Sequence, residues 1–283
     1  MTENSIRTVK IQKIINECKG VKTLIFDVKI NKNENHTPPR PGQFVMVWVP
    51  GIDEVPMSLS GCDNNGTWSI TVKSVGECTN AMINLKIGDY IGVRGPLGNY
   101  FRVPNEKSKE ILLIGGGIGM APLKFFSTEL TKRNIKHIII EGAKIEDNLM
   151  FKEYFRETTA NFSEVHYCTD DGSYGIKAVT PDLFKELINK YDKKDLSNLI
   201  VYSCGPEKML YKLYQICKEH NIEFYASLER IMRCGCGLCG LCAIDPLGLL
   251  VCKDGPIFNS DVLNEMADFG KFKRDIAGKK ISL

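Results

Sequence analysis

The sequence lacks long hydrophobic runs and a strong charge of either sign. Apolar runs such as those at 111–114 and 138–140 are far shorter than the roughly 20 residues that a membrane-spanning helix needs. The first ten residues contain no apolar core of the kind that a signal peptide requires. Thirty-seven basic and 34 acidic residues leave a net charge of +3, which does not indicate binding to nucleic acid or to a membrane surface. We therefore expect a cytoplasmic protein that binds neither.

Histidine is also scarce, whereas cysteine is abundant. The four histidines, at positions 36, 137, 166 and 220, form no cluster, so neither a histidine metal site nor a serine–histidine triad is indicated. Eleven cysteines are present, an odd number that argues against a disulfide framework when no secretory signal is visible. Clustered thiols in a reducing compartment usually bind metal.

Five of the cysteines fall within one segment, RCGCGLCGLCAIDPLGLLVCKDGP. Taking Cys234, Cys239, Cys242 and Cys252 as ligands gives the spacing C-x4-C-x2-C-x9-C, and the first two gaps are typical of plant-type [2Fe–2S] ligation. The alternatives are a zinc site or merely buried thiols. Zinc usually takes two separated C-x2-C pairs, and only one is present. The segment therefore predicts an iron–sulfur cluster and an electron carrier.

The glycines of this segment fit the same interpretation. Those at 235, 237 and 240 permit the positive φ values that a loop wrapping a binuclear cluster requires. They also leave backbone N–H groups free to face the sulfurs. Cys236 lies inside the first gap, so we expect its side chain to point away from the cluster.

The first hundred residues have the pattern of an antiparallel β-barrel. Short runs rich in β-branched and aromatic residues, separated by turn clusters, occur at 23–30, 43–49, 67–74 and 90–94. An amphipathic stretch at 78–85 predicts a helix across one end of the barrel. The turn clusters include those at 36–42 and 62–66.

After the polar segment 104–110, predicted strands alternate with predicted helices. We expect helices at 121–133, 148–158 and 206–220, and another with Thr180 as N-cap and Pro181 at its first helical position. This alternation predicts a doubly wound parallel sheet. The fold class is thus α+β multidomain, with an antiparallel β-barrel at 1–106, a doubly wound α/β domain at 107–228 and a cluster segment with the C-terminal tail at 229–283.

Two glycine-containing turns follow strands of that sheet, GGGIGMAP at 115–122 and SCGPEKM at 203–209. Each leads into a helix, whose N-terminus together with glycine backbone can approach a phosphate. Tight strand–helix packing is the alternative explanation for either turn alone. Because both turns lie at the carboxyl edge of one parallel sheet, they predict a dinucleotide site.

The order of these motifs resembles a known superfamily. A β-barrel carrying GPLGNYF (95–101), then GGGIGMAP, then CGPEKM resembles the ferredoxin–NADP reductases. With the cysteine cluster and TDDGSYG (169–175), nearly the whole chain resembles the electron-transfer subunits of the NAD-dependent, two-subunit dihydroorotate dehydrogenases. This resemblance implies FAD in the barrel, NAD(H) on the doubly wound domain, and a catalytic FMN-containing partner subunit in a heterotetramer.

The flavin motif departs from the family pattern. The family's R-P-x-S appears here as Val55-Pro56-Met57-Ser58, so the arginine that contacts a flavin phosphate is absent. The resemblance places Ser58 near the isoalloxazine edge. In the stretch resembling the family's VGEGT, Cys78 replaces the second glycine, and the backbone at 76–79 with the following helix is implied to neutralise the pyrophosphate.

Several further contacts that the resemblance implies each have an alternative explanation. The resemblance implies that GPLGN closes over the flavin, with Tyr100 or Phe101 either stacking nearby or packing in the core. Cys204 is implied to position the nicotinamide ring, or is simply a buried thiol. Residues 170–172 either contact NAD or cap the turn that they form.

The predicted catalytic residues are thus Cys204 and Ser58, and the predicted metal ligands are Cys234, Cys239, Cys242 and Cys252. The resemblance assigns a further set to FAD or NAD: Pro56, Met57, Ser58, Leu59, Val72, Lys73, Gly76, Glu77, Cys78, Thr79, Gly95, Gly98, Gly115, Gly116, Gly117, Gly119, Asp171, Gly205 and Pro206.

These parts fit one electronic task. NADH delivers two electrons as hydride, a cluster accepts one at a time, and a flavin can mediate between them. The expected order is NADH, FAD, cluster and then the partner protein, which the cluster segment should face from the surface. One rival is the small subunit of a related NAD(P)H:ferredoxin or sulfide oxidoreductase, where the first cluster ligand is often aspartate, unlike Cys234 here. A redox-sensing metal module or a nucleotide-binding protein with a structural metal would contain no flavin.

Overall fold

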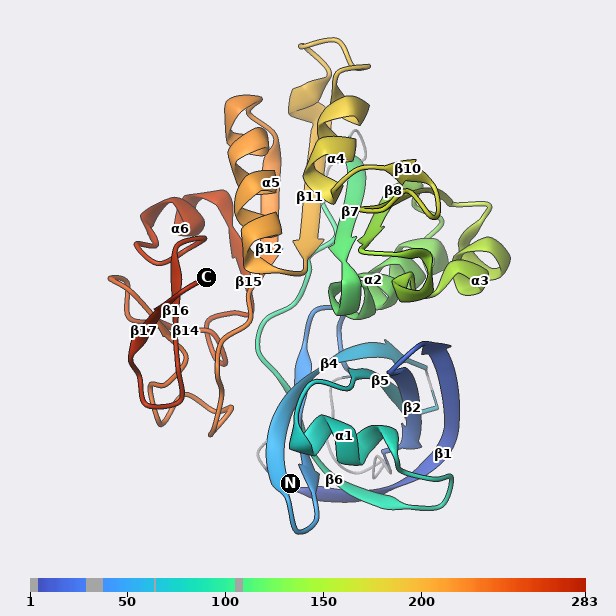
Figure 1. Cartoon of the computed structure of the whole chain (residues 1–283), viewed down its shortest axis with the longest axis vertical. Coiled ribbons are helices and arrows are strands. Elements are labelled where there is room, and N and C mark those ends of the chain that lie inside the picture. Colours follow the sequence, from blue (N-terminus) through green and yellow to red (C-terminus); the bar gives the residue numbers. More distant parts are fainter. Residues whose placement is uncertain (1–4, 29–37, 64, 105–108) are drawn as a thin grey trace.

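The computed structural model describes residues 5–28, 38–63, 65–104 and 109–283, and its parts follow one another along the chain (Figure 1). Within these residues the first part is a closed barrel of six antiparallel strands, ordered β1-β2-β5-β4-β3-β6. The strands are β1 (Arg7–Cys18), β2 (Val21–Asp27), β3 (Phe44–Val49), β4 (Asp53–Cys62), β5 (Thr67–Lys73) and β6 (Tyr90–Leu97). The ends of the strand predicted at 23–30 and parts of the turns at 36–42, 62–66 and 104–110 lie outside the described residues.

Two barrel strands were not expected from the sequence. β1 carries several polar residues between its apolar ones, which hides its alternation. β4 contains Pro56, and proline argues against a strand because it cannot donate to a ladder. The pairing explains the exception: β4 pairs with β3 over its first six residues, whereas its pairing with β5 begins only at Leu59. The first half of β4 therefore has one open side.

Helix α1 (Glu77–Ile83) crosses the barrel, slightly shorter than the predicted 78–85 (Figure 1). Its buried residues, including Cys78 and Met82, pack into the barrel core.

The second part is a seven-stranded sheet in the described chain, ordered β10-β9-β8-β7-β11-β12-β15. All neighbours are parallel except β12 and β15. The strands are β7 (Glu110–Gly116), β8 (His137–Ala143), β9 (Ser163–Thr169), β10 (Ile176–Lys177), β11 (Leu199–Cys204), β12 (Glu223–Ser227) and β15 (Ile257–Asn259).

Helices cover both faces of this sheet, as a doubly wound fold requires. Alternate residues of β7 face opposite sides: Ile111 and Leu113 pack with α2 (Met120–Lys132), whereas Leu112 and Ile114 pack with α4 (Thr180–Ile188) and α5 (Glu207–Glu219). The 3₁₀ turns are η1 (Gly117–Gly119), η2 (Glu146–Asn148) and η4 (Leu196–Asn198).

Two local predictions were wrong. The helix expected at 148–158 begins only at Lys152, because Leu149 is extended and Phe151 is left-handed with φ 57°; it runs as α3 (Lys152–Tyr154) directly into the π-helical η3 (Phe155–Thr159). That path buries three successive apolar side chains at 149–151. At α4 the N-cap is Val179 rather than Thr180, which is the first helical residue.

The chain then leaves β12, forms the cysteine segment with the short hairpin β13 (Ala243–Ile244) and β14 (Leu249–Leu250), and returns to the same sheet as β15. It ends in α6 (Ser260–Glu265) and a hairpin of β16 (Phe272–Arg274) and β17 (Lys280–Ser282). Figure 1 shows this C-terminal part, in orange and red, beside both the sheet and the barrel.

Candidate functional site

A cavity of about 320 Å³ lies where the barrel, the sheet and the C-terminal part meet. The open half of β4 supplies Pro56, Met57 and Ser58, and the facing wall contains Gly119 and Cys204. The remaining lining includes several residues that sequence reasoning did not identify: Phe44, Thr71, Val75, Ile118, Ala121, Pro122, Ser227, Leu228, Glu229, Arg230, Met232 and Pro256. We refer to this space as the barrel cavity. Its volume lies at the lower end of the range for small-molecule sites.

The facing wall depends on a close approach of two loops. A Cβ built on Gly119 would lie 2.2 Å from the carbonyl oxygen of Cys204, so only glycine fits between η1 and the end of β11. The glycine-containing turns at 115–122 and 203–209 are therefore in direct contact at one edge of the sheet, the edge to which the sequence assigned both.

Cys204 is 4% exposed, and burial raises the pKa of its thiol to about 12, although a hydrogen bond with Ser227 acts in the opposite direction. The thiol is therefore protonated at neutral pH. A protonated thiol is a poor nucleophile, so its chemistry here is that of a neutral contact group.

Two further cavities continue along the carboxyl edge of the sheet. One, of about 650 Å³, is lined by Gly116, Gly117 and Pro206 among the predicted residues, and by Asp170 and Lys208. The second, of about 810 Å³, contains Gly205 and the C-terminal hairpin. Lys73, at the end of β5, borders both of them and the barrel cavity, so it stands at their junction.

Several predicted cofactor residues line none of these three cavities. Leu59, Val72 and Cys78 are buried in the barrel core, and Gly115 is buried inside β7. Gly76 and Glu77 begin α1, where Thr79 Oγ1, itself on the cavity wall, accepts hydrogen bonds from the amides of Val75 and Gly76. Those two amides are thus already used within the protein.

The segment GPLGN does not border the barrel cavity. Gly95 packs on Val45, and Gly98 packs on Gly255 and Pro256 at the end of the cysteine segment. The segment thus joins the barrel to the C-terminal part, and its closing over the flavin stays a prediction of the resemblance.

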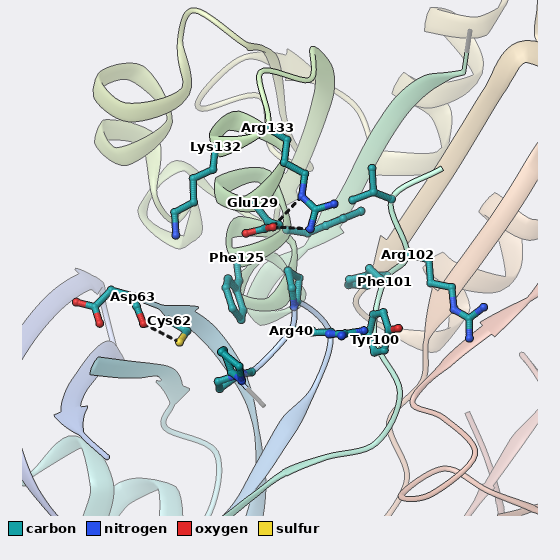
Figure 2. Close-up of a pocket in the computed structure, with 15 residues that line it drawn as sticks. Arg40, Cys62, Asp63, Tyr100, Phe101, Arg102, Phe125, Glu129, Lys132 and Arg133 are labelled. Atoms are coloured by element: carbon teal, nitrogen blue, oxygen red, sulfur yellow. Dashed lines mark hydrogen bonds and ion pairs between the residues drawn. The ribbon is translucent and has the colours of Figure 1, made fainter. Parts of the chain in front are cut away.

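Tyr100 and Phe101 also lie away from the barrel cavity. They border a separate cavity between the barrel and α2, in which Arg40 stacks 4.4 Å above the Tyr100 ring (Figure 2). Phe101 is 2% exposed and packs on Phe126. The core-packing alternative thus describes Phe101.

Asp171 caps its own turn rather than lining a cavity. Its carboxylate accepts hydrogen bonds from the amide and hydroxyl of Ser173, which lower its pKa. The neighbouring Asp170 borders the 650 Å³ cavity instead.

Two charged residues missed by sequence reasoning stand at the opposite wall of the barrel cavity. Burial raises the pKa of Glu229, and Lys273 acts against that shift. Arg230 is held by Glu207 at 2.7 Å and by Asp268 at 3.1 Å. Their sequence signal, a charged pair directly after a predicted buried strand, could have indicated a site at that edge.

The four predicted cluster ligands lie in one loop. The Cys242 thiol interacts with that of Cys252, and the Cys234 thiol interacts with those of Cys239 and Cys236. Among the described residues, no three cysteine, histidine or acidic side chains form a group that could hold one metal ion. A pairwise arrangement suits a binuclear centre, in which each of two irons takes two protein thiolates.

Backbone donors already point at these sulfurs. The amides of Leu238 and Cys239 donate to Cys234 Sγ at 3.3 and 3.4 Å, and the amide of Cys252 donates to Cys242 Sγ at 3.5 Å. Burial opposes ionisation of Cys234, but these amides prevail and lower its pKa to about 6. The loop therefore fits thiolate ligands.

The loop conformation follows the glycine prediction. Gly235, Gly237 and Gly240 have φ values of 65°, 83° and 69°. Burial and then an interaction with the Cys234 thiol raise the pKa of Cys236, and the orientation of its side chain relative to a cluster stays a prediction. Leu238 and Cys239 are exposed at the tip of the loop, with Leu238 85% exposed.

Comparison with known proteins matches these parts in order. Residues 8–101 match an oxidoreductase FAD-binding domain, residues 113–214 an oxidoreductase NAD-binding domain, and residues 229–264 the iron–sulfur cluster binding domain of dihydroorotate dehydrogenase B. A probable dihydroorotate dehydrogenase B (NAD(+)) electron transfer subunit of Methanocaldococcus jannaschii is 42% identical over 272 residues, 96% of each chain. That of Pyrococcus furiosus is 37% identical, covering 97% of this chain and 98% of the relative.

The chain belongs to the family of dihydroorotate dehydrogenase B electron transfer subunits. It therefore carries FAD-binding, NAD-binding and iron–sulfur cluster-binding domains, as the sequence predicted.

Solved structures confirm the predicted architecture. A chain of the NADH-dependent reduced ferredoxin–NADP oxidoreductase is 28% identical, with a TM-score of 0.77 over 92% of this chain and 90% of that one. Ferredoxin–NADP+ reductase from Plasmodium falciparum, 22% identical with a TM-score of 0.61 over 77% of this chain and 94% of that one, shares the fold. In the described part of this family member, no helix is long and apolar enough to cross a membrane.

Proposed function

We propose that this chain passes electrons from NADH, through FAD and a [2Fe–2S] cluster, to a catalytic FMN-containing subunit that oxidises dihydroorotate in pyrimidine biosynthesis, within a cytoplasmic heterotetramer. One observation carries the proposal. The barrel cavity is bordered at once by Ser58 of the barrel, by Cys204 of the dinucleotide edge, and by Met232 and Pro256, which flank the cysteine loop. A flavin in this cavity would thus adjoin both the dinucleotide edge, where NADH would bind, and the cysteine loop that would hold the cluster.

FAD, when bound, supplies the conversion between two-electron hydride chemistry and single-electron transfer. The protein's own part is to hold the reacting rings. Ser58 and the protonated thiol of Cys204 face one cavity as neutral polar groups, so they can orient the rings without reacting with them. Gly119 lets the two loops of the sheet edge close behind them.

The phosphate contact of the missing family arginine falls to Lys73. It borders the barrel cavity beside Thr79 and also the neighbouring dinucleotide cavities. A lysine at this junction can neutralise a phosphate as a point charge, although without the bidentate fork of arginine.

The thiol pairs suggest how the cluster is held. Cys234 and Cys239 would ligate one iron, and Cys242 and Cys252 the other, an assignment supported by the thiol interactions within the loop. The exposed tip at Leu238 and Cys239 would then face the partner subunit.

The domain division at 106/107 and 228/229 remains a prediction. It is supported at the first boundary by the change from barrel to parallel sheet, whereas β15 returns to the sheet from the third part.

A second candidate acceptor follows from one comparison. The chain of 28% identity and TM-score 0.77 belongs to an NADH-dependent reduced ferredoxin–NADP oxidoreductase, an electron-bifurcating system. An assembly of that type would use the same three cofactor sites with another partner.

The test is to purify the full chain anaerobically, record its visible spectrum and add NADH. Joint bleaching of flavin and cluster absorbance is expected, and a colourless zinc protein would end the proposal. Purification with the catalytic subunit, followed by sizing and assays with dihydroorotate and with ferredoxin, distinguishes the two acceptors.

A further inference from the structure

A partly buried ion pair on the outer face of the barrel reaches the first cysteine of the loop. Arg94, on β6, is 9% exposed and grips both carboxylate oxygens of Glu54, with Nε–Oε1 at 2.9 Å and NH2–Oε2 at 2.7 Å. Its remaining nitrogen, NH1, donates to the carbonyl oxygen of Cys234 at 2.9 Å. A single guanidinium therefore joins the barrel to the cysteine loop across 140 positions of sequence.

One of the two strands that carry this ion pair, β4, also borders the barrel cavity. Met46 on β3 is the register partner of Arg94 on β6 and of Pro56 on β4. Pro56 lines the barrel cavity, and Glu54 lies two residues before it on the same strand. The ion pair that holds Cys234 is therefore anchored on β4, a strand that borders the cavity.

The loop rests on this face at one further point. A Cβ built on Gly235 would lie 2.7 Å from Met46 Cγ and 3.3 Å from Leu97 Cδ1. The backbone after Cys234 therefore lies directly on the barrel, and the arginine fixes it there.

The chemistry of arginine suits this task. Its planar fork can satisfy a carboxylate with two N–H groups and still present a third to a carbonyl, which lysine cannot do in one fixed geometry. The fork also brings one positive charge, largely shielded from water, beside a cysteine whose thiolate would bind iron. Positive charge near an iron–sulfur centre favours its reduced form.

We propose that Arg94, fixed by Glu54, is a positioning residue that holds the Cys234 end of the cluster loop against the flavin-binding barrel and raises the reduction potential of the cluster. The inference rests on the proposed function, since it needs a cluster on the loop and a flavin in the barrel cavity.

Two single variants and the double variant distinguish the effect of the Arg94 charge from that of the tether, by which we mean the hydrogen bond from Arg94 to the Cys234 carbonyl. Arg94→Met removes the positive charge and leaves Glu54. Glu54→Gln retains the side-chain size but leaves the arginine unpaired. The double variant has the same net charge at this site as the parent but lacks the tether. Arg133→Gln is the matched control, because Arg133 also grips a glutamate, Glu129, by Nε and NH2 but contacts no part of the loop.

The first readout is an EPR-monitored redox titration of the anaerobically purified full chain. In Arg94→Met we expect the ratio of reduced to oxidised cluster at a fixed potential to fall about tenfold, which corresponds to about 59 mV for one electron. Glu54→Gln should move the ratio in the opposite direction, and the double variant should return near the parent value.

The second readout is stopped-flow reduction by NADH. The double variant should reduce its flavin at the parent rate but transfer to the cluster about tenfold more slowly, because small misplacements of reacting groups slow a reaction by that order or more. The third is hydrogen exchange of the loop amides at Leu238 and Cys239, which should quicken in Arg94→Met even when the cluster has been removed.

Parent-like potentials, transfer rates and loop exchange in all three variants would overturn the inference. If Arg94→Met loses its cluster while FAD stays bound, loop exchange in the double variant decides: quickening supports the tether, and parent-like exchange refutes it. Failure of the proposed function is a different result, since the parent chain itself would then show no NADH-dependent bleaching.

Discussion

The side-chain amide of Asn99 exchanges two hydrogen bonds with the backbone of Ile257: Nδ2 donates to the carbonyl oxygen at 2.8 Å, and Oδ1 accepts from the amide at 2.9 Å. Nδ2 also donates to the carbonyl oxygen of Asp254, and the backbone amide of Asn99 donates to the carbonyl oxygen of Gly255. One residue of the GPLGN motif thus fastens the barrel to the point where the cysteine segment rejoins the sheet.

Replacing Asn99 by alanine should loosen that junction. Three side-chain hydrogen bonds are lost and backbone groups are left unpaired, so we expect the free energy of unfolding to fall by about 2–3 kcal/mol. Chelator-driven loss of the cluster should also become faster. Urea denaturation and iron release measure the two effects. Asn84→Ala, which removes a single exposed hydrogen bond to Asn80, is the control and should cost under about 1 kcal/mol. Equal costs for the two variants would contradict this account.

Cys239→Ser should separate the two halves of the relay. The substitution removes one proposed ligand at the exposed loop tip, far from the hydride site, so NADH should still reduce the flavin while transfer through the cluster disappears. Rapid-mixing absorbance and EPR follow each step. Cys62→Ser, a half-buried thiol outside the loop, should retain both activities. Loss of flavin reduction in a folded Cys239→Ser protein would refute the order of transfer.

Gly119→Ala tests the loop contact behind the barrel cavity. The added methyl would meet the Cys204 carbonyl at 2.2 Å, where no flexible group can yield, so we expect a loss of about 3 kcal/mol or more and slower flavin reduction. Gly117→Ala is the comparison, because φ is +52° there but no atom lies within 4 Å of the added carbon. Backbone strain alone should cost about 1 kcal/mol. If denaturant curves of the two variants coincide, the close approach does not matter.

Glu141 should make the protein less stable as pH rises. It is fully buried on β8, and its Oε1 accepts a hydrogen bond from the Met150 amide, whereas its Oε2 has no partner among the residues that the structure describes. Burial raises its pKa to about 8. In the unfolded chain the carboxyl ionises near pH 4.5, whereas the folded protein holds the proton until about pH 8. The folded state thus binds more protons in this window, so stability falls from pH 4.5 towards pH 8.

Glu141→Gln retains the acceptor for Met150 and cannot ionise. Between pH 5 and pH 8 the parent should lose about 4 kcal/mol more than this variant. Denaturant titrations at the two pH values measure the difference. Glu129→Gln, at a partly exposed ion pair, should leave the slope as in the parent. A parent-like slope in Glu141→Gln would assign the pH dependence to other groups.

The sequence was most informative where one residue type dictates a local geometry. The positive φ values of Gly235, Gly237 and Gly240 and the contact between the turns at 115–122 and 203–209 follow from glycine chemistry and strand direction alone. β4 was missed because Pro56 cannot donate to a ladder of hydrogen bonds. It is tolerated because β5 pairs with β4 only from Leu59 onward, and that pairing depends on the assembled barrel rather than on the local sequence.

Long-range partners could not be predicted in the same way. Arg94 and Cys234, or Asn99 and Ile257, are more than 130 positions apart, and nothing in their local sequence marks them as neighbours. The packing of Gly98 in the GPLGN motif against Gly255 and Pro256 was likewise not predicted. Side-chain contacts between separate parts depend on how whole elements dock.

Ser227 and Ile257 are register partners on adjacent strands, so the span 228–256 leaves the sheet and returns one strand spacing away. The span therefore connects two adjacent antiparallel strands, as the turn of a β-hairpin does. A short turn in its place would leave both strands joined but would remove Leu228, Glu229, Arg230, Met232 and Pro256 from the wall of the barrel cavity. One excursion from the sheet therefore both carries the cysteines and completes the cavity beside them.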